Sequence, residues 1–160
     1  MQVLCADLKD HLPEILVEWR EITREEPWLS LPEEHRLNSL PDVLSALLDA
    51  ALCTPEEMAA QERHVIAAAE HGRARREQGF RDALLFTEYY LLREAVWRYL
   101  RRLSTDSEKV RQAIFRIDTA VTVATSASLF GYHRDEIERR GEWPEVLQRL
   151  ITASPVVPKQ

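Results

Sequence analysis

The sequence has little of what β-sheets, disulfide frameworks and DNA-binding surfaces require. Only 4 of its 160 residues are glycine, and alternating apolar and polar runs are nearly absent, so no sheet is expected. Its two cysteines, Cys5 and Cys53, fit no CxxC or zinc spacing, which predicts buried or idle thiols in a protein of the reducing cytosol. The net charge of −6 argues against a duplex nucleic-acid partner, which would favour a basic face.

Targeting and membrane-spanning segments are also missing from the pattern. The chain does not open with a charged and then apolar signal sequence. The longest apolar candidate, around residues 114–130, is interrupted by Arg116 and Asp118, and a span needs roughly 18 apolar residues. The sequence therefore predicts a cytoplasmic protein without a membrane span.

The usual catalytic and cofactor motifs are missing as well. There is no glycine-rich phosphate loop, no GxSxG and no HExxH. The ExxH pair of di-iron bundles occurs only once and reversed, from His133 to Glu136. We therefore predict no catalytic residues, no metal and no cofactor, and we expect the chain not to be an enzyme.

What the sequence does contain is typical of one helical domain. Ala, Leu, Glu and Arg dominate, and these are strong helix formers. We expect an all-α bundle of five or six helices over residues 1–152, followed by a Pro-containing tail over residues 153–160. Apolar spacing predicts helices over 3–26, 41–52, 54–79, 81–103, 105–139 and 144–152. Pro13 either kinks the first of these or begins a second helix.

Capping patterns mark two of the predicted helix starts. Thr54-Pro55-Glu56-Glu57 and Thr105-Asp106-Ser107-Glu108 each have the form of a capping box, in which a threonine and a later glutamate satisfy free backbone donors. Gly79 and Gly141 are placed to end the helices that follow these boxes.

The helix over 81–103 carries two apolar stripes and should therefore be central. The first stripe is Leu85, Tyr89, Leu92, Val96, Tyr99 and Leu103, and the second is Phe86, Tyr90, Trp97 and Leu100. Because Tyr89 and Tyr90 are adjacent, one is expected in the core and the other half exposed.

The helix over 105–139 carries a line of small residues, Ala113, Ala120 and Ala127. Small side chains let another helix approach closely. The partner is either a second chain, in a two-fold homodimer that uses this helix as an output lever, or the first helix of the same chain.

Residues 70–94 form the most distinctive stretch. They predict an αα-hairpin closed by Phe80, in which His71 and Arg75 lie near the returning helix and Glu88 pairs with an arginine. We take His71, Arg75, Glu88 and Tyr89 as candidate ligand-binding residues. His64 and His71 share a helix face, which haem ligation could use; otherwise both are partly exposed, or His71 bonds a core carboxylate.

The same stretch resembles a known family. The run HGRARREQGF, from His71, and then EYYLLRE, from Glu88, are similar to the N-terminal domain of RsbT co-antagonist proteins of the RsbRD type, as is LNSLPDVLSAL over residues 37–47. That domain also precedes some bacterial sensor histidine kinases, and related stressosome proteins carry a globin-like domain without haem. The resemblance covers roughly residues 3–135 and implies an all-α sensory or partner-binding domain of a stress-response regulator.

The resemblance also implies a partner. A domain of this kind feeds an output module or a protein partner, and no kinase-like or STAS-like sequence follows in this chain. We expect a stand-alone or excised signal-input domain, dimeric, that binds a protein. The alternative is a small-molecule or haem sensor.

Overall fold

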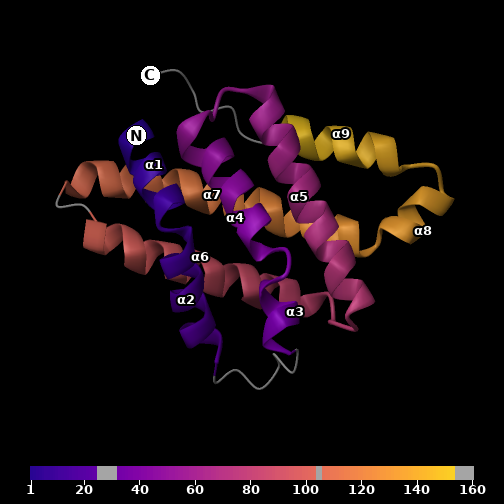
Figure 1. The fold of residues 1–160 in the computed structure, drawn as a ribbon. Coiled ribbons are helices and arrows are strands. Elements are labelled where there is room, and N and C mark those ends of the chain that lie inside the picture. The colour runs from indigo at the N-terminus through magenta and orange to yellow at the C-terminus, as the bar shows by residue number, and fades with distance from the viewer. Residues whose placement is uncertain (25–31, 104–105, 154–160) are drawn as a thin grey trace.

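The computed structural model describes residues 1–24, 32–103 and 106–153, and all the regular secondary structure of these residues is helical (Figure 1). The all-α prediction is confirmed, but the described residues contain more helical segments than the five or six expected. These are α1 (Gln2–Asp10), α2 (Leu12–Thr23), α3 (Glu33–Leu37), α4 (Leu40–Leu48), the π-helix η1 (Asp49–Cys53), α5 (Met58–Glu77), α6 (Ala83–Leu103), α7 (Ser107–Tyr132), α8 (Arg134–Arg139) and α9 (Trp143–Ala153). The predicted tail lies almost wholly outside the described residues.

The first predicted helix is two helices. α1 ends at Asp10, and α2 starts with Pro13 in its first turn, where a proline costs no helical hydrogen bond. Cys5 and Leu8 of α1 and Ile15 and Trp19 of α2 are fully buried. Of the two alternatives for Pro13, the start of a new helix is correct.

The prediction of idle thiols is wrong. Cys5 of α1 and Cys53 at the end of η1 form a disulfide, with their Cα atoms 5.6 Å apart. This distance lies in the ordinary range for disulfides. Sequence spacing did not indicate the pair because 48 positions separate its members, and only the return of the chain through α4 brings them together.

The capping box at Thr54 does not form. α5 begins at Met58, after Glu57 and without a side-chain cap. The Thr54 hydroxyl instead donates back to the carbonyl of Asp49, at 3.4 Å, and so closes the π-helix. The predicted helix over 41–52 is correct in position, but its last turn widens into η1.

The start of α7 is capped one residue later than predicted. Asp106 is the N-cap, and its carboxylate accepts from the backbone N–H groups of Glu108 and Lys109. Thr105, the predicted cap, lies outside the described residues. The helix also ends earlier than expected, at Tyr132, and α8 continues beyond a break at His133.

α5 crosses α7 in direct backbone contact (Figure 1). A Cβ placed on Gly72 would lie 1.8 Å from the carbonyl oxygen of Ser128, and one on Gly131 would lie 1.9 Å from that of Ala69. Only glycine permits this approach, because any side chain would collide with the opposite backbone. The contact fixes how these two central helices cross.

The line of Ala113, Ala120 and Ala127 is taken up by packing within the chain. All three alanines are buried, the most exposed being Ala120 at 8%. Ala127 lies next to the Ser128 contact with α5, so the close neighbour there is α5 rather than the predicted first helix. The interchain seam predicted on this face therefore has no free surface in the folded chain.

α6 buries most of the first of its two predicted stripes, but not its last member, since Leu103 is 37% exposed. Tyr89, Leu92 and Val96 are at most 1% exposed, whereas Tyr99 is only half-buried. The second stripe is wrong at its start, since Phe86 is 55% and Tyr90 54% exposed.

The exposed side of α6 carries a cation–π stack in place of the predicted core. The guanidinium of Arg93 lies 5.0 Å from the ring centre of Tyr90 and 4.9 Å from that of Trp97. This stack allows large aromatic side chains to remain at the surface.

α7 is long and apolar enough, by length and composition alone, to cross a membrane. Such a single helix is weak evidence, because core helices of globular domains pass the same test. Here α7 packs against α5, α6 and α9.

Candidate functional site

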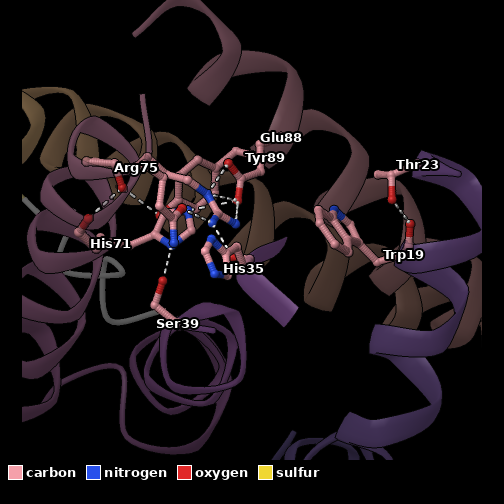
Figure 2. A network of polar contacts seen from close by, with 11 residues as sticks. Trp19, Thr23, His35, Ser39, His71, Arg75, Glu88 and Tyr89 are labelled. Atoms are coloured by element: carbon pink, nitrogen blue, oxygen red, sulfur yellow. Dashed lines mark hydrogen bonds and ion pairs between the residues drawn. The ribbon is translucent and has the colours of Figure 1, made fainter. Parts of the chain in front are cut away.

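A network of buried polar side chains lies where α5, α6, α7 and the start of α4 meet (Figure 2). α5 contributes His71 and Arg75, one helical turn apart, and α6 contributes Glu88; all three are 0% exposed. Three ionisable groups removed from water must offset their desolvation cost by pairing with one another, or the folded state would lose several kcal/mol of stability. The sequence prediction that these residues come together is supported by the geometry.

Arg75 and Glu88 form a bidentate ion pair. The Nε of Arg75 donates to both carboxylate oxygens, at 3.2 and 3.1 Å, and its Nη2 donates to Oε1 at 2.8 Å. The Nη1 of Arg75 donates to the carbonyl of His35 and to the side chain of Gln78, each at 2.7 Å. Arg75 therefore ties α5 to α6 and to α3 at once, with a fork geometry that a lysine could not supply.

Glu88 carries its charge despite complete burial. Burial raises the pKa of this carboxyl, but the charges and hydrogen bonds of His71 and Arg75 outweigh that effect and lower the pKa to about 2. The Nε2 of His71 lies 2.9 Å from Oε1 of Glu88. The carboxylate is thus the centre of the network, shared by the guanidinium of Arg75 and the imidazole of His71.

His71 continues the network to α4. Its Nδ1 lies 2.6 Å from the hydroxyl of Ser39, the residue before α4. The ring therefore links the Ser39 hydroxyl on one side to the Glu88 carboxylate on the other. The predicted alternative in which His71 bonds a core carboxylate is therefore the one the structure contains.

The series Ser39, His71, Glu88 has the order of a hydrolytic triad but not its geometry. In such triads the imidazole receives the serine proton at Nε2 and is oriented by a carboxylate at Nδ1, whereas here the two nitrogens are reversed. Arg75 also occupies both oxygens of the carboxylate. The arrangement resembles a structural joint more than a nucleophile with its base.

Tyr89 extends the polar contacts to α7. Its ring meets that of His71 edge-on, with centroids 5.8 Å apart, and its hydroxyl lies 2.7 Å from Oγ of Ser128. Ser128 donates its only hydrogen to the carbonyl of Ala68, at 2.6 Å, so Tyr89 must be the donor to Ser128. Burial raises the pKa of Tyr89, which therefore keeps this hydrogen.

The corner between α5 and α6 holds the two halves of the network in register. Gly79, with φ of 75°, turns the chain out of α5, and the N–H of Phe80 donates to the carbonyl of Arg75 at 2.9 Å. Phe80 is 3% exposed, and its ring lies 5.6 Å from the Arg75 guanidinium. The predicted αα-hairpin with Phe80 in its corner agrees with this geometry.

His64 lies two turns before His71 on α5 and differs from it. It is fully buried rather than partly exposed as predicted, and neither ring nitrogen has a hydrogen-bond partner among the described residues. Burial lowers its pKa to about 4, so it is a neutral imidazole at pH 7.

Several members of the network were not predicted. Ser39, Ser128 and the His35 carbonyl come from segments far from 70–94 in sequence. No local pattern marks a serine that will meet a histidine 32 positions away. Only the packing of α4 and α7 against the hairpin brings them to it.

Comparison with protein-family models gives a match over most of the chain. The family model described as "RsbT co-antagonist protein rsbRD N-terminal domain" matches residues 13–147, which include every side chain of the network. No curated protein and no solved structure shows a match. Because the family model covers most of the chain, this protein belongs to the family of RsbT co-antagonist RsbRD N-terminal domains.

Proposed function

We propose that the chain is a non-catalytic signal-input and protein-interaction domain of a bacterial stress-response regulator. The family match over residues 13–147 carries this proposal, since the family is a regulatory one in a partner-switching stress response. The network explains how such a domain could work. A displacement of any one of the segments that meet at Glu88 changes the surroundings of one buried charge.

In this proposal the network links the helices to one another and does not form an open ligand pocket. Its side chains are those of His71, Arg75, Glu88 and Tyr89. Their polar groups face one another at 0–1% exposure, which leaves little for a ligand to bind. A buried ion pair adds little net stability but penalises every arrangement that separates its members. Any packing of the helices that separates this pair would then lie above the paired arrangement in energy.

The test is direct binding of an RsbT homologue from the source cell to the purified full chain. We expect saturable binding, weakened in Glu88→Gln and kept in Glu94→Gln, a matched change at a partly exposed ion pair on the same helix. Retained helicity by circular dichroism must accompany any loss. No binding by the unchanged chain would remove the interaction role.

The homodimer remains a proposal of its own. Because the alanine line is buried, a second copy would have to use another surface, and the exposed aromatics Phe86, Tyr90 and Phe115 on α6 and α7 are available. Light scattering of the purified chain decides it. A monomer mass at high protein concentration would remove the dimer from the account.

A haem or small-molecule sensor is the second candidate, and His64 is the observation that favours it. A neutral imidazole without a partner is the form that ligates haem iron. However, His64 is 0% exposed, so ligation would require the helices around it to separate. Titration with hemin tests this, because binding gives a Soret band that His64→Leu should abolish.

A further inference from the structure

Two cross-links join α1 to η1 side by side. Lys9 Nζ lies 2.6 Å from Oδ1 of Asp49, and Cys5 is bonded to Cys53. Lys9 follows Cys5 by four residues in α1, and Asp49 precedes Cys53 by four in η1. The ion pair and the disulfide therefore lie one helical turn apart, on the facing sides of α1 and η1. The carboxylate oxygen of Asp49 and the two sulfur atoms all lie within 4.8 Å of one another.

The two cysteine residues differ in exposure. Cys5 is 0% exposed, whereas Cys53 is half-buried at the end of η1. A π-helical turn is rare, and such turns are found frequently at functional sites. Here Cys53 is the last residue of η1 and pairs with Cys5 of α1.

We propose that Cys53 and Cys5 are a reversible thiol-oxidation site, at which formation of the disulfide fastens α1 to the rest of the domain. Oxidising low-molecular-weight disulfides are the class of reactant. The site's role as a signal input rests on the function proposed above, whereas its chemistry does not.

The reaction runs in two exchange steps. The Cys53 thiolate attacks one sulfur of a small disulfide, forming a mixed disulfide and releasing one small thiol. The Cys5 thiolate then attacks the sulfur of Cys53, forming the protein disulfide and releasing the second small thiol. The two protein thiols lose two protons and two electrons, and the small disulfide gains them. Excess small thiol reverses both steps.

Lys9 supports this chemistry. Its ammonium group pairs with Asp49, so the carboxylate does not place an uncompensated negative charge beside the thiolates. The ion pair also keeps α1 close to η1 when the sulfur atoms are reduced, which preserves the geometry for the next oxidation.

The structural consequence falls on α1. This helix has nine residues and fully buries only Cys5 and Leu8, and a helix of that length is marginal on its own. Residues 13–147 match the family, so α1 precedes the matched region, and the bond fastens it to η1 inside that region. In a reducing compartment a disulfide of this kind is typically transient and redox-sensing.

The first experiment measures the exchange on the full chain in mixtures of reduced and oxidised glutathione. Cys5→Ser should accumulate a glutathione adduct on Cys53, which is partly exposed. Folded Cys53→Ser should stay unmodified, because its remaining cysteine, Cys5, is fully buried. Both variants should react in denaturant. Failure of the unchanged folded chain to exchange, or faster reaction of Cys5 than of Cys53, would overturn the proposal. Stoichiometric Zn²⁺ binding by the reduced chain would also overturn it, since Cys5, Cys53 and Asp49 would then be metal ligands.

The second experiment measures amide hydrogen exchange over residues 2–10 in both redox states. We expect exchange in the oxidised chain to be slower by at least about tenfold, and no difference between the same two buffers in Cys53→Ser. Equal exchange in both states would show that the bond does not fasten α1. Partner binding is measured separately in each redox state. If the cysteines exchange as expected but no partner binds, the result counts against the proposed function and not against the redox site.

Discussion

Replacing Glu88 by Gln should destabilise the domain by removing a buried negative charge that both His71 and Arg75 contact. Gln keeps the shape of the side chain but removes the buried carboxylate charge that the Arg75 guanidinium contacts. Breaking a buried pair in this way costs about 3–5 kcal/mol. The lowered pKa gives a second figure: the difference between 4.5 and about 2 corresponds to about 3 kcal/mol, at about 1.4 kcal/mol for each pH unit.

The pH dependence separates this effect from a simple packing defect. Because the pKa of Glu88 is lower in the folded than in the unfolded chain, the unfolded chain binds more protons between pH 4.5 and about 2. The stabilisation is therefore fully present above pH 4.5 and is lost as the pH falls towards 2. Glu88→Gln has no carboxyl to titrate, so its stability should approach that of the unchanged chain over this range.

The assay is urea unfolding followed by circular dichroism, from pH 7 downward, for the unchanged chain, Glu88→Gln and Glu94→Gln. Glu94→Gln should cost less than about 1 kcal/mol, since it loses only a partly exposed pair with Arg98. A cost below about 1 kcal/mol for Glu88→Gln, with a difference from the unchanged chain that does not shrink below pH 4.5, would refute the reasoning.

Three further changes test other parts of the structure. Because burial lowers the pKa of folded His64, the unchanged chain should lose about 3 kcal/mol of stability as the pH falls from 6.5 to about 4. His64→Leu should not show this loss. Urea midpoints of the two chains that run parallel over that range would contradict the prediction. Gly72→Ala should cost more than about 2 kcal/mol by urea titration, since its Cβ would meet the Ser128 backbone, and a neutral result would mean that α5 and α7 separate freely. Leu92→Ala should cost about 2–5 kcal/mol at a site 1% exposed, and a cost below about 1 kcal/mol would place Leu92 outside the packed core.

Local patterns predicted the helices well. Apolar spacing located α4, α5, α6 and α9 to within a few residues, because each buries one periodic face. Gly79 and Gly141 end helices as expected, both with positive φ. The pairing of His71 and Arg75 with Glu88 was also predictable, since a tight hairpin brings these near positions together.

The errors came from the contacts that each residue makes in the folded chain, which the local pattern does not reveal. The sequence around Thr54 fits a capping box, but its hydroxyl donates to the carbonyl of Asp49 in the preceding π-helix instead. Phe86 and Tyr90 continue an apolar stripe, yet no helix among the described residues covers them, and Arg93 stacks on Tyr90 instead. Ala120 lies on a line suited to a second chain, and packing within the chain buries it.

The most direct test of the central claim is a binding isotherm between the full chain and a purified RsbT homologue from the same cell, recorded for the unchanged chain and for Glu88→Gln. The account predicts saturable binding by the unchanged chain and weaker binding by the folded variant, because the buried network holds the interacting arrangement of the helices. No saturable binding by the unchanged chain would contradict the interaction role, and equal binding by both would contradict the role of the network.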